Sequence, residues 1–297
     1  MKKPVFTGAC VAIATPFAPD GSVDFDALGR LIEFQISNGT DAITICGTTG
    51  EKSTLADGEH KECIEYCVKK VAGRVPVIAG TGGNDTRYSL SLCRHAESVG
   101  ADALLCVTPY YNKASQAGLV RHFEYLADNV NIPIILYNVP SRTGMTIAPD
   151  TYARLAGHPN INGTKEASGD FSLVAKIRAV CGDELNIWSG NDDQVVPMMS
   201  LGAKGVISVL SNIVPGVVAK MARAALDGDF KTASEIQIEY LRLANDLFLE
   251  VNPIPVKTAL GMMGLCSPDL RLPLCEMGEA NAEKLARTLE HYHLINR

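Results

Sequence analysis

A lysine and a tyrosine at the ends of two successive β-type runs are the residues best suited to chemistry. Tyr137 ends the apolar run that begins at residue 132, and Lys165 lies where the run 161–165 meets a polar loop. If the two runs form neighbouring strands, the amine and the phenol lie close together. A lysine amine can form a Schiff base with a keto acid, and a phenol can move the protons. Taken alone, a lysine after a strand is more often a surface residue. Whether Lys165 is catalytic therefore depends on the pattern of the rest of the chain.

Eight short β-type runs alternate with segments of helical spacing along most of the chain. The runs are largely continuous in apolar residues, as expected of strands that are buried on both faces. Between them, segments such as 28–36 carry apolar residues at helical spacing, and Asp24 and Thr86 stand where helices should begin. The expected strands are 10–15, 42–46, 77–80, 103–107, 134–137, 161–165, 186–189 and 205–209.

This alternation predicts an α/β protein with a (β/α)8 TIM barrel over residues 1–228. A doubly wound sheet is the alternative, but its usual Gly-x-Gly-x-x-Gly turn after the first strand is missing. Residues 229–297 carry no strand pattern. Within them we expect one long amphipathic helix over 230–251, an interruption at Pro253 and Pro255, and two further helical segments. This C-terminal helical region should pack on the barrel as an appendage.

Polar residues follow the expected strands at the end where barrel enzymes place their chemistry. Thr48 and Thr49 follow the second strand, Arg142 lies in the loop after Tyr137, and Gly190 follows the seventh strand. A lysine amine attacks only when it is unprotonated, and burial in the barrel mouth favours that form. Thr48 and a tyrosine could pass protons between Tyr137 and solvent.

Two carboxylate sites are expected at the same rim. The backbone amides and hydroxyl of Gly47-Thr48-Thr49 can hold one carboxylate, and the guanidinium fork of Arg142 suits a second. For Arg142 alone, a structural salt bridge is an equally good interpretation.

The composition excludes several classes of function. The chain has 297 residues, a net charge of -6 and no long basic run, which argues against nucleic-acid binding. No apolar stretch is long enough for a transmembrane helix, so no membrane association is expected. Lys2 and Lys3 before the apolar run 8–15 match the pattern of a signal peptide only weakly, since that run is short and ends at Pro16. A first buried strand explains it better.

Metal and phosphate sites are not indicated by the sequence. The nine cysteines form no Cys-x-x-Cys pair, which argues against zinc and favours buried free thiols in the cytoplasm. Residues 80–83 could cradle a phosphate, but no Gly-Lys-Ser/Thr follows, so a tight turn is preferred. Asp192 and Asp193 could bind a metal, yet no histidine or third carboxylate is nearby in sequence. We interpret them as a solvated loop or a helix start.

Three motifs together resemble the dihydrodipicolinate synthase family, within the superfamily of class I pyruvate-dependent aldolases. They are Gly47-Thr48-Thr49-Gly50-Glu51, Tyr137-Asn138-Val139-Pro140-Ser141-Arg142-Thr143-Gly144 and Gly163-Thr164-Lys165-Glu166. The resemblance extends from about Phe6 to the C-terminal helices and includes Asn252-Pro253-Ile254-Pro255-Val256-Lys257. It implies a lyase that condenses pyruvate with L-aspartate 4-semialdehyde, the first committed step towards diaminopimelate and lysine.

The resemblance also assigns roles to residues. Lys165 would form the Schiff base with pyruvate, and Tyr137 would donate and accept protons. Thr48 and Tyr111 would complete a proton relay, with Tyr111 reaching into the neighbouring subunit's site. Substrate contacts would come from Thr49, the Ile207 backbone and Gly190 for pyruvate, and from Arg142 for the semialdehyde. No metal or organic cofactor is expected, and the implied assembly is a homotetramer built as a dimer of dimers.

Two rival functions stay open on the sequence. Sialic-acid lyases and sugar-acid aldolases share the fold and the Schiff-base lysine, but they typically lack the Ser-Arg-Thr-Gly segment found at 141–144. A non-catalytic keto-acid-binding regulator would be expected to lose a residue of the proton relay. All four of Lys165, Tyr137, Thr48 and Tyr111 are present.

A lysine-feedback site is implied at the dimer interface of inhibited family members. Asn84, Tyr110 and His60 match its usual residues, whereas Lys52, Ser53 and Tyr88 depart from them. Tyr88 stands where an inhibited enzyme has a glutamate that holds the amine of the bound lysine. Because that carboxylate is missing, we expect lysine inhibition to be weak or absent.

Overall fold

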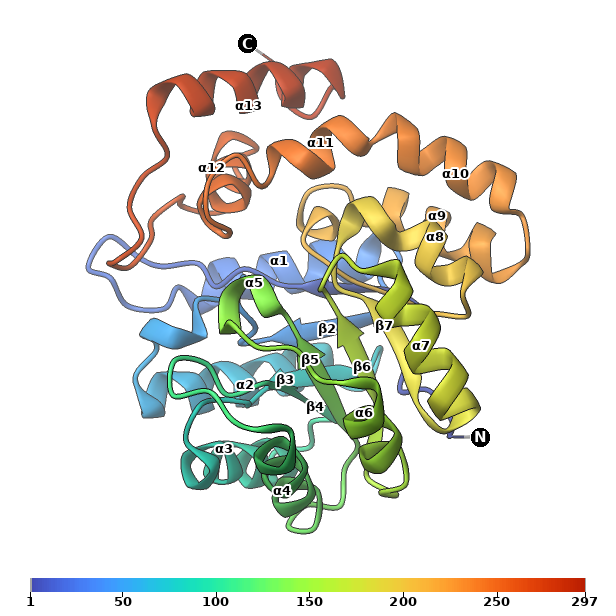
Figure 1. The fold of residues 1–297 in the computed structure, drawn as a ribbon. Coiled ribbons are helices and arrows are strands. Elements are labelled where there is room, and N and C mark those ends of the chain that lie inside the picture. Colours follow the sequence, from blue (N-terminus) through green and yellow to red (C-terminus); the bar gives the residue numbers. More distant parts are fainter. Residues whose placement is uncertain (1, 297) are drawn as a thin grey trace.

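Residues 2–296 of the computed structural model contain a closed barrel of eight parallel strands in the order β1 to β8 (Figure 1). Each strand pairs with the next in sequence, and β1 closes the ring on β8. The predicted TIM barrel is therefore confirmed. The strands are β1 Gly8–Ala12, β2 Ala42–Ile45, β3 Val77–Gly80, β4 Ala103–Val107, β5 Ile134–Asn138, β6 Ile161–Glu166, β7 Asn186–Ser189 and β8 Gly205–Ser208.

The first strand is displaced towards the N-terminus from the expected 10–15. Gly8 pairs with Gly205 of β8, and a Cβ on Gly205 would lie 1.9 Å from the Gly8 carbonyl oxygen. The pairing therefore depends on two bare backbones, a feature that an apolar run cannot reveal. Beyond Ala12 the Ile13 amide still donates to the Thr44 carbonyl of β2 at 3.1 Å, and the Ala14 amide then donates to Asn212 Oδ1 at 3.1 Å.

Two concentric apolar layers explain why the strand runs are continuous in apolar residues. All residues of the eight strands are buried. Because side chains alternate along a strand, one set fills the barrel and the other packs under the helices. Inside the barrel, Trp188 of β7 stacks on Phe6 with ring centroids 5.1 Å apart. Lys165 of β6 is paired with this tryptophan in the ladder.

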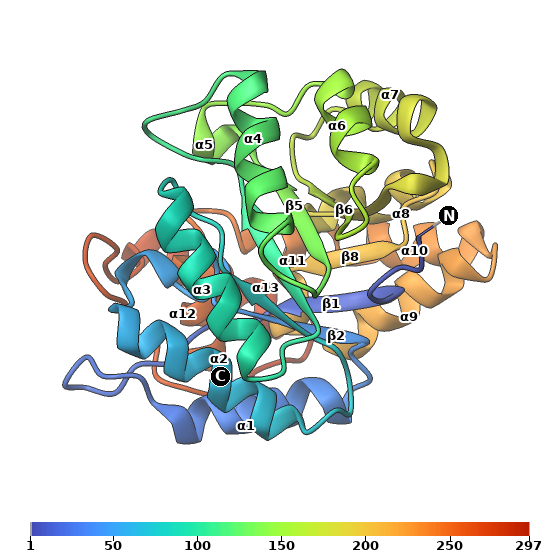
Figure 2. The ribbon, with the colours of Figure 1, turned by 90° about the horizontal axis from the view of Figure 1, so that it is seen from below.

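Helices surround the barrel, as the view from below shows (Figure 2). The expected start of the first helix at Asp24 is confirmed, since its Oδ1 accepts from the Ala27 amide at 2.8 Å. The expected cap at Thr86 is wrong. Asp85 caps that helix by accepting from Arg87 and Tyr88. The helices are α1 Phe25–Ser37, α2 Asp57–Val71, α3 Thr86–Ser98, α4 Gln116–Ala127, α5 Pro140–Thr143, α6 Pro149–Ala156, α7 Phe171–Cys181, α8 Val195–Ser200, α9 Pro215–Leu226, α10 Phe230–Glu239, α11 Leu241–Asp246, α12 Ile254–Met262 and α13 Glu279–His291.

The C-terminal region is helical, but the single long helix expected over 230–251 is wrong. The structure has two helices there, α10 and α11, which meet at Tyr240. The Tyr292 hydroxyl donates to the Glu239 carbonyl at 2.6 Å, and the two tyrosine rings stack 4.8 Å apart. This tertiary contact occupies a carbonyl at the break. Figure 1 shows α11, α12 and α13 over one end of the barrel. The division into 1–228 and 229–297 stays a prediction. Across that boundary, α10 packs on α8 and α9.

Burial of His122 predicts a loss of stability in acid. His122 of α4 lies with Nδ1 2.8 Å from Thr86 Oγ1, and burial lowers its pKa to about 4. The unfolded chain, with a histidine pKa near 6.5, therefore binds more protons than the folded chain between these values. Stability is present above this window and lost as pH falls through it. As pH falls through this range, the free energy of unfolding measured with urea should decrease by up to about 3 kcal/mol more for the native chain than for His122→Gln. Equal pH dependence in both proteins would contradict this assignment.

Candidate active site

The amine and phenol singled out by the sequence face each other inside the barrel. Tyr137 and Lys165 are directly paired across β5 and β6. Lys165 Nζ lies 4.5 Å from the centroid of the Tyr137 ring, and the two residues are only 5% and 8% exposed. The expectation that their runs form neighbouring strands is confirmed. The surface-lysine alternative is wrong for Lys165.

Space for the Lys165 side chain depends on a glycine. A Cβ on Gly190 would lie 2.6 Å from the Ala167 Cβ and 3.1 Å from Lys165 Cε. Any larger residue at 190 would therefore clash with Ala167 and crowd the Lys165 side chain. This steric constraint gives a physical reason for glycine at a position the sequence placed in the site.

A buried carboxylate fixes the strand ends on which both residues lie. Glu166 accepts hydrogen bonds from Asn138 Nδ2 at 2.9 Å and from the Tyr152 hydroxyl at 3.0 Å. Its Oε1 also accepts from the Ser168 amide at 2.8 Å. Burial raises the pKa of Glu166, and these hydrogen bonds oppose that rise. Since Asn138 and Glu166 directly follow Tyr137 and Lys165, the network limits how far the two strand ends can shift apart.

A cavity of about 420 Å³ opens over this pair. Lys165, Tyr137 and Gly190 line it from the barrel, together with Thr48 and Thr49 from the loop after β2. Arg142 of α5 also lines the cavity and is itself exposed to solvent. The cavity thus combines an amine, a phenol, two hydroxyls and a guanidinium. This set suits imine formation on a keto acid that carries a carboxylate.

Four cavity-lining residues from the C-terminal region were not expected at the site. They come from the connection between α11 and α12 and are Phe248, Glu250, Val251 and Asn252. Asn252 Nδ2 donates to Thr49 Oγ1 at 3.0 Å, and its carbonyl accepts from Arg142 Nη2 at 3.2 Å. The sequence resemblance covers the segment 252–257 without predicting where it lies, and the structure places Asn252 of this segment at the cavity.

Comparison with known proteins agrees with this geometry. Residues 5–292 match the model of the dihydrodipicolinate synthetase family. The 4-hydroxy-tetrahydrodipicolinate synthase of Geobacter metallireducens is 54% identical over 98% of this chain and 100% of its own length. The chain belongs to the dihydrodipicolinate synthetase family.

Solved structures of the family extend the likeness to the backbone. The dihydrodipicolinate synthase of Aquifex aeolicus has a TM-score of 0.95 at 50% identity, with 97% of this chain and 99% of that chain covered. The chloride-inhibited enzyme of Acinetobacter baumannii, solved in complex with pyruvate, has a TM-score of 0.96 at 42% identity, with 97% and 99% coverage. The barrel and its C-terminal helices therefore superpose on the family as one unit.

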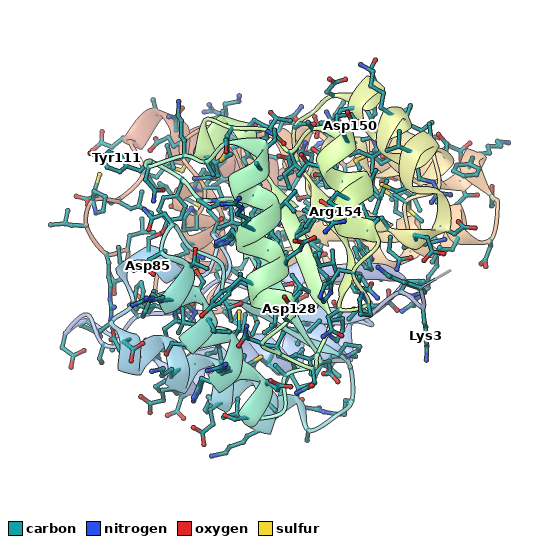
Figure 3. All side chains as sticks on the ribbon, turned by 60° about the horizontal axis from the view of Figure 1, so that its bottom comes forward. Lys3, Asp85, Tyr111, Asp128, Asp150 and Arg154 are labelled. Atoms are coloured by element: carbon teal, nitrogen blue, oxygen red, sulfur yellow. The ribbon has the colours of Figure 1, made fainter. Side chains whose placement is uncertain are left out.

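Two of the residues expected at the site are not among those that line the cavity. Tyr111 is 90% exposed, with a φ of 69° in a loop at the edge of the molecule (Figure 3). Ile207 of β8 is buried in the barrel interior, and Val209 lines the cavity near it. The role given to the Ile207 backbone, like the other residue roles taken from the family, stays a prediction.

Asp192 corrects the interpretation of the aspartate pair. It begins a 3-10 helix over Asp192–Gln194, as expected for a helix start, but it is buried rather than solvated. Its Oδ2 accepts from the Val209 and Leu210 amides, each at 2.9 Å, and burial raises its pKa. Asp192 thereby fixes the chain that leaves β8. Among residues 2–296, no three His, Cys, Asp or Glu side chains converge as metal ligands would.

Two residues of the implied lysine site, Lys52 and His60, contact the chain at the end of β3. Lys52 Nζ donates to the Gly82 carbonyl, and His60 Nε2 lies 2.9 Å from the Gly80 carbonyl oxygen. Burial lowers the pKa of His60 to about 4, and the positive charge of Lys52 adds to that effect. The Asn84 carbonyl accepts from Asn112 Nδ2 at 2.9 Å.

The remaining members of this group are less buried. Ser53 is exposed, Tyr88 is 43% exposed, and Tyr110 is half-buried. Burial raises the pKa of Tyr88, and the nearby Asp57 carboxylate adds to the rise. A tyrosine beside a carboxylate therefore occupies the position where the sequence resemblance implied a glutamate.

Proposed function

We propose that this chain condenses pyruvate with L-aspartate 4-semialdehyde through a Schiff base on Lys165, giving 4-hydroxy-tetrahydrodipicolinate. The observation that carries the proposal is the pairing of Lys165 with Tyr137 inside a cavity that also holds Thr48, Thr49 and Arg142. Membership of the family over nearly the whole chain supports the same lyase reaction and its place in lysine biosynthesis.

The first half of the reaction uses the buried pair. Lys165 Nζ attacks the keto carbon of pyruvate, and loss of water leaves an imine. Tyr137, whose ring lies against the amine, protonates the departing hydroxyl and accepts a proton when the pyruvate methyl group is converted to the enamine carbon. The Thr49 hydroxyl and the neighbouring backbone amides hold the pyruvate carboxylate.

The second half joins the two substrates. The enamine carbon attacks the aldehyde carbon of the semialdehyde, while the Arg142 guanidinium holds the carboxylate of that substrate. The amino group of the semialdehyde then attacks the imine carbon, closes the ring and releases Lys165. Thr48 and Tyr111 pass protons between Tyr137 and solvent. No cofactor is required, because the imine itself supplies the electron sink.

The two rival functions have less support. A sugar-acid aldolase would use the same lysine, but Arg142 and the full-length relatives favour a semialdehyde acceptor. A non-catalytic regulator would not need the buried amine and phenol to be in contact.

Assembly and location belong to the same proposal. We assign a homotetramer built as a dimer of dimers, in which the exposed Tyr111 enters the site of a second copy. The cytoplasm is proposed as the compartment, supported by nine free cysteines of which seven are buried. No helix among the described residues is long and apolar enough to cross a membrane.

A coupled assay tests the proposed reaction directly. Protein, pyruvate and L-aspartate 4-semialdehyde are mixed with excess dihydrodipicolinate reductase and NADPH. NADPH consumption should require both substrates and should be abolished in Lys165→Ala, which lacks the nucleophile. Consumption by Lys165→Ala at the native rate would contradict the mechanism. No consumption by the native protein, with sugar-acid cleavage instead, would favour the aldolase.

Arg142→Ala should separate the two substrates. Loss of a charge-assisted contact should raise the KM for the semialdehyde by about 10- to 100-fold, with a much smaller change for pyruvate. Arg142→Lys is the matched control, because it keeps the charge but loses the planar fork of donors. Its KM for the semialdehyde should lie between those of the native protein and Arg142→Ala. Equal increases for both substrates would remove the assigned role.

Lysine should inhibit the enzyme weakly or not at all. The Lys52 ammonium already lies within this group, where it donates to the Gly82 carbonyl, and Tyr88 offers no carboxylate to a bound amine. We therefore expect micromolar L-lysine to leave turnover unchanged in the coupled assay. Lys52→Ser combined with Tyr88→Glu is the converse test and should gain sensitivity. Strong inhibition of the native enzyme at micromolar L-lysine would refute the hypothesis.

A further inference from the structure

A fully buried ion pair links the C-terminal region to the loop after β2. Lys257 Nζ lies 2.7 Å from Glu51 Oε1, and the two side chains are 0% and 1% exposed. The ammonium also lies over the Phe17 ring, 4.1 Å from its centroid. The other carboxylate oxygen, Oε2, accepts from the Arg271 amide at 3.2 Å. Both carboxylate oxygens and the ammonium therefore have partners.

Burial of such a pair is costly, so its stabilising effect alone does not explain it. Removing two charges from water commonly costs as much free energy as their attraction returns, and apolar replacements of buried pairs are often as stable. A buried pair does fix the relative position of the two segments that carry it. The relevant question is therefore what Glu51 and Lys257 hold in place.

Glu51 ends the loop that supplies two hydroxyls to the cavity. Thr48 and Thr49 line the cavity, and Glu51 closes their turn by donating its amide to the Thr48 carbonyl at 3.1 Å. Glu51 has a φ of 50°, in the left-handed region that a side chain other than glycine rarely adopts. Such a conformation persists only where the surroundings impose it. The Glu51 carboxylate is held on both oxygens, by Lys257 Nζ and by the Arg271 amide, and these are buried contacts of the kind that can impose it.

Asn252 provides a second attachment to the same loop. Its Nδ2 donates to Thr49 Oγ1 at 3.0 Å, so a lone pair of that hydroxyl is occupied. The single hydroxyl proton of Thr49 is then free to donate to an acceptor in the cavity. Lys257 lies one turn into α12, and its amide donates to the Pro253 carbonyl at 3.0 Å. One short segment thus holds the loop at both Thr49 and Glu51.

We propose that Lys257 is a positioning residue for the reaction, which holds the Thr48-Thr49 turn in the geometry that receives the pyruvate carboxylate. Lys257 does not touch substrate and acts only through Glu51. The inference rests on the proposed function, because it assumes that pyruvate occupies the cavity beside Lys165. It also gives the segment 252–257 a purpose that the reaction scheme leaves unassigned.

The test measures how much pyruvate is needed to half-saturate borohydride trapping on Lys165. Lys257→Met alone leaves the Glu51 charge buried without its partner, which is strongly destabilising, so Lys257→Met combined with Glu51→Gln carries the test. The double variant should melt close to the native temperature yet need at least about tenfold more pyruvate. In the coupled assay its KM for the semialdehyde should change much less. A double variant with native half-saturation would overturn the proposal.

Lys2→Met is the matched control. Lys2 Nζ donates to the carbonyls of Ala156, His158 and Ile161, around the start of β6 and away from the cavity. This variant should lower the melting temperature without changing half-saturation by pyruvate. An equal effect on half-saturation would show that general loss of stability is sufficient and would overturn the positioning role. If native protein fails to trap pyruvate at all, the proposed function fails first and this inference fails with it.

Discussion

The pairing register of β5 and β6 is the constraint on which the rest of the site depends. It sets Tyr137 directly beside Lys165, with the amine 4.5 Å from the ring centroid. Because side chains alternate along a strand, a slip of either strand by one residue would turn that strand's group out of the barrel and separate the pair. The Glu166 network just beyond the pair and the missing side chain at Gly190 both act to preserve this arrangement.

The C-terminal region contributes to the site as well as covering the barrel. Asn252 connects the Thr49 hydroxyl with the Arg142 guanidinium, and so lies between the groups proposed to hold the two substrates. The Lys257 to Glu51 pair adds a second link a few residues further along. Lys165 and Tyr137 come from the barrel strands, whereas Asn252 and Lys257 bring contacts from the C-terminal region to the loop after β2.

The sequence alone predicted the eight strands because parallel strands buried on both faces leave continuous apolar runs. Because these strands end at one rim of a barrel, the residues that follow them were expected together there. The cavity brings six of them together: Lys165, Tyr137, Thr48, Thr49, Arg142 and Gly190. The sequence missed the helix break at Tyr240, since periodicity does not register a hydrogen bond from Tyr292. Nor could it pair Lys257 with Glu51, because nothing local connects residues so far apart in the chain.

Peptide-level mass spectrometry after borohydride reduction in the presence of pyruvate shows which lysine forms the imine. We expect a reduced pyruvyl adduct on the peptide that contains Lys165, with none on the peptides that contain Lys52 or Lys257. Preincubation with L-aspartate 4-semialdehyde and pyruvate together should lower the adduct yield, because turnover consumes the imine. An adduct on another lysine, or no adduct with pyruvate alone, would contradict the assignment of Lys165 as the nucleophile.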